Sequence, residues 1–234
     1  MKITHQNFKN NNLNRVRIVL SLFFFISASI FVFSQNDSIK KQTNNYYKDP
    51  VAEYFKKVRF RIGGGVLIPQ SGLKDYFGNS PMIELSTVFP LKRKKSLELA
   101  VQFVIPNQKK SFQYVTTLET VDAKATFMFN PMLRFKKHLL STYKSDLNIS
   151  LGLGASILRT DARNPFYEGK ENDKKYEIIT SFLASPGIEY THKFANKEHI
   201  SIGLNFQYSP YKIEGALQED IGSFFYVPRI AYKF

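Results

Sequence analysis

The chain ends in the stretch 224-FFYVPRIAYKF-234, in which apolar and polar side chains alternate. Tyr226 and Ile230 fall on one side of an extended segment, whereas Arg229 and Lys233 fall on the other. A repeat of two residues places successive side chains on opposite faces of a β-strand. The stretch therefore predicts a strand with one apolar face that runs to the last residue of the sequence.

The same alternation recurs along the chain in eight segments that polar stretches separate. The segments span residues 58–68, 83–89, 97–105, 121–135, 147–157, 176–190, 200–210 and 224–234. None of the 49 positions on their apolar sides is charged, although a shuffled chain with 22% charged residues would place about 11 charges there. The charged residues occupy the other side of six of these segments: Arg59, Arg61, Glu84, Glu98, Asp122, Lys124, Arg134, Glu177, Glu189, Arg229 and Lys233.

This sorting of charge predicts an all-β fold, an eight-stranded antiparallel up-and-down transmembrane β-barrel whose apolar side faces lipid. In the fourth segment that side includes Ala123 and Ala125. An Arg or Lys on the lipid face costs about 2–4 kcal/mol near the middle of a bilayer, so the charges are expected inside. The connections after the second, fourth and sixth segments are shorter on average than the rest, as in barrels with short periplasmic turns and long external loops. The eleven-residue connection 136–146 fits this pattern least well.

Three prolines, Pro131, Pro186 and Pro228, fall inside segments that run toward the predicted periplasmic side. Proline removes one hydrogen bond from a strand ladder and is found at edges and bulges. We therefore expect a common bulge or a widened rim at the depth of these prolines in the three strands, and misplaced strand boundaries are the alternative.

The terminal strand resembles the closing strand of outer-membrane β-barrels, which ends on an aromatic residue. Tyr232 and Phe234 would then form the signal that the barrel-assembly machinery reads during insertion. From about Val58 to Phe234 the chain resembles small outer-membrane β-barrel proteins of the OmpA/OmpX-like or "porin family" type. The resemblance implies a location in the cell outer membrane, in contact with its lipid and lipopolysaccharide.

Residues 1–34 have the features of a cleaved signal peptide. Their positive charges precede an uncharged apolar run of 16 residues, which is shorter than the about 20 residues of a membrane-spanning helix. Cleavage is expected near Ser34 and Gln35, and an uncleaved anchor is the alternative. Residues 35–56 are polar and predict a flexible periplasmic linker, which leaves residues 57–234 for the barrel.

Composition supports one exported domain. The net charge falls from +14 to +10 when the four positive charges of the leader are removed. The remaining Lys and Arg residues are dispersed, so a nucleic-acid partner is not expected; lipid head groups and internal carboxylates are the better partners. The chain has no cysteine, which excludes a disulfide framework and a lipidated cysteine.

An eight-stranded barrel has room for side chains or one small ligand, unlike the channel of a larger porin. We therefore expect a plugged lumen and no solute pore. Buried charges need partners, so the inward charges are predicted to pair in a lumenal network made of Arg59, Arg61, Glu84, Glu98, Glu189 and Arg229. A proton or ion path along this network is the alternative.

No pattern in the sequence indicates an enzyme, a metal or a cofactor. Omptin-like, PagP-like and PagL-like barrel enzymes need reactive groups at the outer rim, but His138, His192 and His199 fall at the predicted periplasmic ends. The glycines at 63–65 lack the lysine and helix of a phosphate-binding loop. The oxygen-rich stretch 161–173 matches no calcium-loop spacing, so it is expected to be a solvated external loop.

The sequence thus favours an integral outer-membrane β-barrel with a structural or interaction role, which displays external loops that could contact a protein partner. One alternative is an accessory barrel of a secretion apparatus, similar in size to those of gliding and type IX systems. Another is a soluble periplasmic carrier of the lipocalin type, which would turn the apolar face inward. A rim enzyme is the least favoured class.

Overall fold

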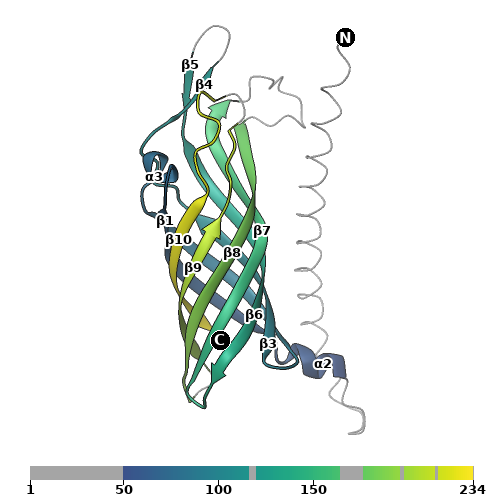
Figure 1. Cartoon of the computed structure of the whole chain (residues 1–234). Coiled ribbons are helices and arrows are strands. Elements are labelled where there is room, and N and C mark those ends of the chain that lie inside the picture. Colours follow the sequence, from purple (N-terminus) through teal and green to yellow (C-terminus); the bar gives the residue numbers. More distant parts are fainter. Residues whose placement is uncertain (1–49, 116–119, 164–175, 196–197, 214–215, 234) are drawn as a thin grey trace. The chain divides into compact units, whose positions relative to one another are not determined.

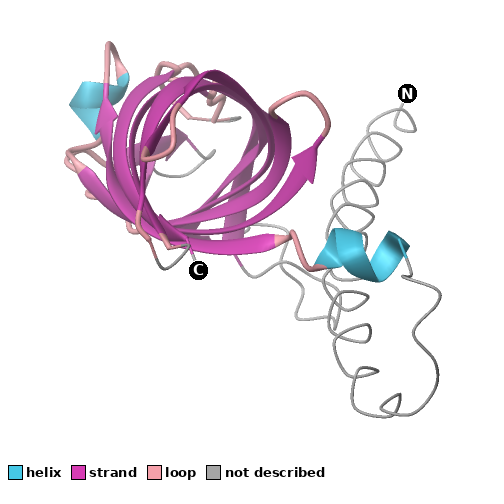
Figure 2. Ribbon diagram, turned by 90° about the horizontal axis from the view of Figure 1, so that it is seen from below, coloured by secondary structure: helices cyan, strands magenta, loops and turns pink. Residues whose placement is uncertain are grey.

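The computed structural model describes residues 50–115, 120–163, 176–195, 198–213 and 216–233. Within these ranges, eight long antiparallel strands close into one barrel, and each pairs with its neighbour along the chain (Figure 1). The barrel strands are β1 (Arg59–Pro69), β2 (Ser80–Leu91), β3 (Lys95–Val104), β6 (Ala125–Ser141), β7 (Ser145–Arg163), β8 (Tyr176–Lys193), β9 (His199–Tyr208) and β10 (Phe224–Lys233). Pairing of β1 with β10 completes the ring that Figure 2 shows from one end. The predicted fold class, an eight-stranded antiparallel up-and-down barrel, is confirmed.

The two ends of the barrel differ in their connections. We call the end where β1 begins and β10 finishes the terminal end, and the opposite end the loop end. At the terminal end, residues 92–94 and 142–144 form short turns. The eleven-residue connection expected at 136–146 is therefore wrong, because β6 continues to Ser141 and β7 begins at Ser145.

The loop end carries further structure between the barrel strands. Helix α3 (Leu73–Tyr76) lies between β1 and β2, and the hairpin of β4 (Phe112–Val115) and β5 (Thr120–Ala123) lies between β3 and β6 (Figure 1). Before β1, the last residues of the predicted linker form the short helix α2 (Pro50–Phe55). No helix in the described ranges is long and apolar enough to cross a membrane. The predicted signal peptide lies outside the described residues.

The two faces of the barrel wall are sorted as the alternation predicts. On the outer face, Leu151 is 48% exposed and Phe182 is 55% exposed. On the inner face, Arg61 is 5% exposed and Glu98 is fully buried. Apolar side chains thus coat the outside, and most of the charges point into the lumen. Asp122 of β5 and Lys124, which the alternation also placed inside, are instead exposed at the loop end.

One part of that prediction is wrong, namely the outward position of Ala123 and Ala125. Both alanines are buried inside the apolar core at the loop end. Ala123 belongs to the β4–β5 hairpin rather than to the barrel wall, and the register of β6 against β7 shifts between Ala125 and Phe127. Because a shift of one residue exchanges the two faces of a strand, the alternation of β6 cannot be extended backward through Ala125.

The predicted proline bulge is also wrong. Pro131, Pro186 and Pro228 each pair in register with one neighbouring strand. Pairing with the other neighbour skips the proline and resumes without a shift. A proline on the outer face removes one ladder bond, and the register absorbs that loss without an extra residue.

Candidate functional site: the barrel lumen

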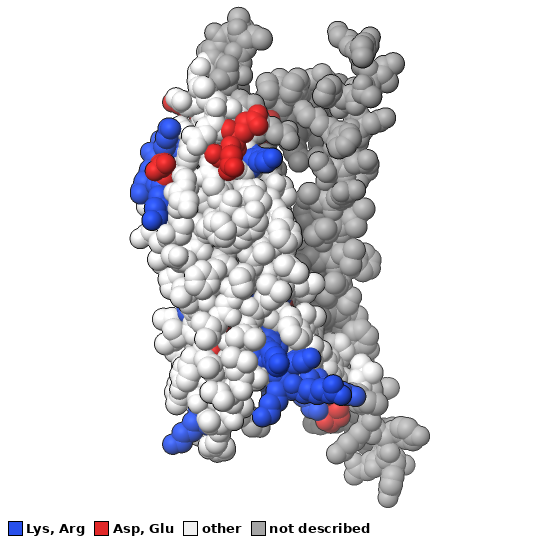
Figure 3. All heavy atoms as spheres, viewed as in Figure 1, with Lys and Arg blue, Asp and Glu red and all other residues white. Residues whose placement is uncertain are grey.

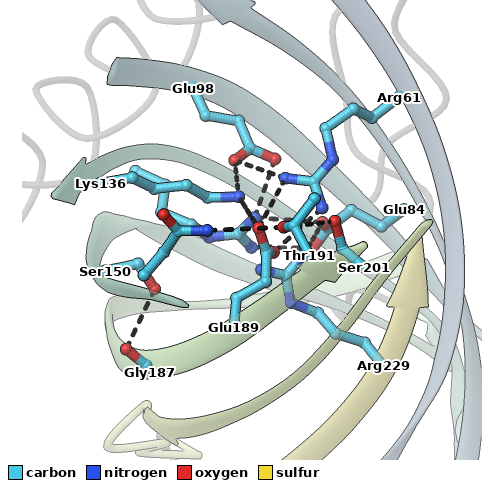
Figure 4. Close-up of polar contacts among 12 residues, drawn as sticks. Arg61, Glu84, Glu98, Lys136, Ser150, Gly187, Glu189, Thr191, Ser201 and Arg229 are labelled. Atoms are coloured by element: carbon cyan, nitrogen blue, oxygen red, sulfur yellow. Dashed lines mark hydrogen bonds and ion pairs between the residues drawn. The ribbon is translucent and has the colours of Figure 1, made fainter. Parts of the chain in front are cut away.

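Seven charged side chains meet inside the terminal half of the barrel, and six different strands supply them. Each is at most 5% exposed. We call this group the ionic cluster; its members are Arg61 of β1, Glu84 of β2, Glu98 of β3, Arg134 and Lys136 of β6, Glu189 of β8 and Arg229 of β10 (Figure 4). Strand register explains the gathering, because every member lies on the inner face of its strand.

Two arginines each bridge two carboxylates. Arg134 donates from Nη2 to Glu84 Oε2 at 2.8 Å and from Nη1 to Glu98 Oε1 at 3.0 Å. Arg229 donates from Nη1 to Glu84 Oε1 at 2.7 Å and from Nη2 to Glu189 Oε2 at 2.6 Å. The planar guanidinium with its several donors suits this bridging between two partners. Glu84 is thereby linked to both of the other carboxylates.

The remaining two cations close the ring. Arg61 lies 3.3 Å from Glu98 and 3.0 Å from Glu189, measured between side-chain nitrogen and oxygen. The Lys136 ammonium lies 2.5 Å from Glu98 and 3.0 Å from Glu189. Every carboxylate of the ionic cluster therefore contacts at least two cations. Four cations face three carboxylates, which leaves one excess positive charge.

The structure brings together five of the six residues that the sequence assigns to a lumenal network: Arg61, Glu84, Glu98, Glu189 and Arg229. The sixth, Arg59, lies nearer the terminal end and donates to the backbone carbonyls of Lys56 at 2.6 Å and Val58 at 3.2 Å. Its assignment to the network is therefore corrected.

Sequence reasoning missed two members of the cluster. Arg134 stands on the charged side of its segment, so the signal was present in the alternation. Lys136 continues the same inner face two residues later, but the apparent loop from 136 onward concealed it. Extending the alternation of β6 by one more inward position would have found Lys136.

The other residues singled out by the sequence lie apart from this cluster. Tyr232 lies in β10 opposite Ile62 and Ile200, and Phe234 lies outside the described residues. His138 lies at the terminal end, where its Nδ1 is 3.7 Å from Asp146 Oδ2. Most of the oxygen-rich stretch 161–173 lies outside the described residues. Among the residues described, no group of three or more His, Asp or Glu side chains is placed to hold a metal ion.

The loop half of the lumen is filled by apolar side chains. Inner-face residues of the strands pack there with residues of α3, of the β4–β5 hairpin and of the segment after β9. We call this group the apolar cluster; it comprises Leu67, Leu73, Tyr76, Phe77, Met82, Val104, Phe112, Ala123, Ala125, Met128, Leu158, Ala162, Ile179, Tyr211, Ile213, Ile221, Phe225 and Val227. The loop segments thus return to cover the end of the barrel from which they emerge.

A chain of hydrogen bonds connects the two clusters. The hydroxyls of Tyr211 and Ser156 lie 2.5 Å apart, and Ser156 donates to Asn130 Oδ1 at 2.6 Å. Asn130 donates to Gln102 Oε1 at 3.3 Å, and Gln102 donates to Glu84 Oε2 at 3.0 Å. Burial raises the pKa of Tyr211 to about 12, so its hydroxyl remains protonated at neutral pH. The polar groups of this chain of hydrogen bonds are therefore satisfied, whereas the fully buried amide of Gln207 in β9 has no hydrogen-bond partner among the described residues.

Comparison with known proteins gives structural likeness only. The fold is similar to Ail, the attachment invasion locus protein of Yersinia pestis, at 10% identity and a TM-score of 0.41, over 76% of this chain and 97% of that one. It is also similar to the N-terminal β-barrel domain of Pseudomonas aeruginosa OprF, at 14% identity and a TM-score of 0.38, over 75% of this chain and 97% of that one. No protein-family model and no curated protein sequence matches the chain.

Proposed function

We propose that this protein is an integral outer-membrane β-barrel with a plugged lumen, which conducts no solutes and acts through the structures it displays at its loop end. The observation that carries the proposal is the polarity of the two faces of the barrel wall, which is the reverse of that in a soluble barrel. Large apolar side chains point outward while the ionic cluster lies inside, an arrangement that suits a hydrocarbon solvent around the barrel.

The height of the apolar wall supports a bilayer location. On β7 the outward positions from Leu147 to Ile157 are all apolar. Eleven residues at about 3.3 Å each, tilted by about 45°, cover roughly 25 Å, the height of the apolar band of membrane barrels. In the view of Figure 3, charged side chains gather toward the two ends, and the wall between them is largely uncharged.

Two alternatives receive less support. A soluble lipocalin-like carrier would need its apolar faces inside, whereas Leu204 and Phe206 of β9 are exposed on the outer wall. The secretion-apparatus alternative has no observation in its favour among the described residues. Enzyme activity is not proposed, because the described histidines 138, 192 and 199 lie at the terminal end.

The closed lumen rests on the two clusters together. The ionic cluster occupies the terminal half and the apolar cluster occupies the loop half, so a solute would have to displace both. The terminal end would then face the periplasm, and α3, the β4–β5 hairpin and the residues 209–213 and 216–223 would face outward. These are the surfaces that we propose contact lipopolysaccharide or a protein partner.

Membrane extraction and conductance together test the proposal. We expect the protein to leave membranes only with detergent, to migrate differently on gels before and after boiling, and to produce no stepwise conductance in planar bilayers. Release by osmotic shock would contradict the membrane location, and steady ion channels of the wild-type protein would contradict the plugged lumen.

A pair of substitutions tests which face meets lipid. Leu151→Arg places a charge on the middle of the outer wall and is expected to lower the unfolding free energy in vesicles by about 2–4 kcal/mol. Leu140→Arg places the same charge near the terminal end, where Leu140 is 66% exposed, and is expected to cost about 0–1 kcal/mol. Equal effects of the two substitutions would contradict the bilayer assignment.

A further inference from the structure

A cavity of about 160 Å³ opens at the terminal end of the barrel. Inner-face side chains line it, and Arg61, Lys136 and Glu189 of the ionic cluster form part of its wall. Pockets for drug-sized ligands measure about 300–1,000 Å³, so this one suits a small ion. We call it the mouth cavity.

Positive charge dominates the lining of the mouth cavity. Arg59 and Arg61 occupy alternate positions at the start of β1 and therefore share its inner face. Lys57, in the turn before β1, also lines the cavity. Lys233 of β10 stands directly opposite Arg61 in the strand register. Like charges on directly opposed positions destabilise a sheet, so the barrel gathers cations here at an energetic cost.

The carboxylates that face the mouth cavity already have cationic partners. Asp146 Oδ1 lies 2.7 Å from the ammonium of Lys193, and Glu189 is held by three cations of the ionic cluster. Among the described residues, no ion pair reaches Arg59 or Lys233. The excess charge of the ionic cluster adds to theirs.

Lys95 of β3 adds a further cation to the lining, and the remaining groups around the cavity are neutral or weakly basic. His138 of β6 and His199 of β9 face it from two sides, while Ser96, Asn148, Thr191 and Ser201 contribute hydroxyl and amide groups. The part of the wall on β2, next to Arg59, consists of Val88 and Pro90. The lining thus offers several hydrogen-bond donors and no further carboxylate beyond Asp146 and Glu189 among the described residues.

We propose that the mouth cavity is a binding site for a phosphate-type oxyanion, held by Arg59 and Lys233 with Lys57 at the entrance. Nη1 of Arg59 donates to the carbonyls of Lys56 and Val58, which leaves its Nε and Nη2 to give two parallel hydrogen bonds to such an anion. The Lys233 ammonium supplies a compact charge. Bound anion would also offset the repulsion between Lys233 and Arg61. This site does not depend on the membrane location, because it is contained in the barrel itself.

Titration calorimetry with inorganic phosphate tests the site on the mature protein folded in dodecyl maltoside micelles at constant ionic strength. We expect one saturable site per chain in the wild type. Replacing both cations, Arg59→Gln with Lys233→Gln, is expected to weaken binding about tenfold or more, because charge-assisted hydrogen bonds are the strong ones. If the double variant fails to fold, Lys233→Gln alone at the strand end serves the same comparison.

A charge-matched control separates a built site from diffuse attraction. Lys92→Gln with Lys137→Gln removes two exposed charges at the same end of the barrel, and neither residue lines the mouth cavity. We expect affinity within about twofold of wild type, since exposed charges contribute little. Absence of saturable binding, or equal weakening in both double variants, would overturn the proposal.

A second arm distinguishes the source of the phosphate group. Doping the micelles with phosphatidylglycerol supplies lipid phosphate without free phosphate. A fall in the apparent affinity for inorganic phosphate assigns the site to a lipid head group, and an unchanged affinity assigns it to the free anion. Under both outcomes, we expect the variant that replaces Arg59 and Lys233 to bind inorganic phosphate more weakly than the wild type.

Discussion

The two halves of the lumen are filled by opposite chemistry. In the loop half, eighteen residues form the apolar cluster, and each adds stability as its own surface leaves water. In the terminal half, seven charged residues form the ionic cluster, and each depends on the others, because a buried charge without a partner is strongly penalised. The difference teaches that a narrow barrel can be closed either by independent contacts or by an interdependent ring.

The lengths of the connections between the barrel strands explain why the ionic cluster lies at the terminal end and the apolar cluster at the loop end. At the terminal end the turns are short, so the strands themselves must supply whatever occupies the lumen, and long side chains such as Arg134 and Arg229 reach across it. At the loop end, α3, β4 and the segment after β9 can fold back into the opening. Apolar residues on those segments, such as Leu73 and Phe112, then fill the lumen there, as the charged side chains do at the terminal end.

The largest expected effect comes from opening the ionic cluster. Glu189→Gln removes the carboxylate that contacts Arg61, Lys136 and Arg229, so the cluster carries two excess charges. We expect the unfolding free energy in vesicles to fall by about 3–5 kcal/mol, measured by urea titration of the gel-mobility shift. The exposed Glu219→Gln serves as control.

A second substitution in the Glu189→Gln variant tests whether the residues of the ionic cluster depend on one another. Adding Lys136→Met to Glu189→Gln restores the charge count of the wild type, so we expect part of the lost stability to return. Additive losses in the double variant would show that the ring is no more than a sum of separate pairs, and the contrast between the halves would fail.

The next largest effect is expected in the apolar cluster. Leu158→Ala on the inner face of β7 removes a fully buried side chain and is expected to cost about 2–4 kcal/mol through lost burial and a cavity. Leu153→Ala changes the outer face of the same strand, where the side chain is 48% exposed, and should cost less in the same urea titration. A larger loss from Leu153 would contradict the assignment of inner and outer faces.

A smaller effect is expected where strands approach each other closely. A Cβ at Gly154 would lie 2.7 Å from Met132 Cα and would also meet the backbone oxygen of Pro131, so Gly154→Ala must shift β6 and is expected to cost about 1–3 kcal/mol. At Gly64 the nearest atom, Met82 O, is 3.6 Å away. Gly64→Ala should leave the urea midpoint almost unchanged, and a reversed order would contradict the packing described here.

The smallest global effect is expected from the covering segments. Phe112 of β4 packs its ring 5.7 Å from that of Tyr76 and 6.0 Å from that of Phe77. Phe112→Ala is expected to speed amide hydrogen exchange in α3 and β4 and to change the global unfolding free energy by less than about 1 kcal/mol, because local opening does not require the barrel to unfold. Equal acceleration in β7 and β8 would show that cover and barrel unfold together.

Sequence reasoning succeeds where the two faces of a strand differ in polarity. In the terminal half, residues such as Arg61 and Glu98 alternate with apolar neighbours, so the period of two identifies both the strand and its orientation. In the loop half the same reasoning places Phe224 and Tyr226 correctly on the outer face but misplaces Ala123 and Ala125. There the interior is also apolar, and buried residues such as Ala125, Met128 and Leu158 look no different in the sequence from the residues of the outer face.

The remaining errors have local physical causes. The ionic cluster was incomplete because Lys136 follows a strand whose end could not be located from polarity alone. Arg59 was included because it shares the inner face of β1, although its depth in the barrel, which alternation does not encode, takes it away from Glu98 and Glu189. The β4–β5 hairpin was missed because its strands are four residues long, too short for a periodic signal.

The seam between the first and last barrel strands has a consequence for how the molecule is made. Gly63 and Gly65 have no side chains on the inner face, which lets β1 approach Ala231 and Arg229 of β10. Without β10, β1 and β9 would each present an unpaired edge, and such edges invite pairing with other chains. A truncated chain is therefore left with open edges and a lumen that lacks Arg229, so completion of the ring is the step that turns an aggregation-prone intermediate into a finished protein.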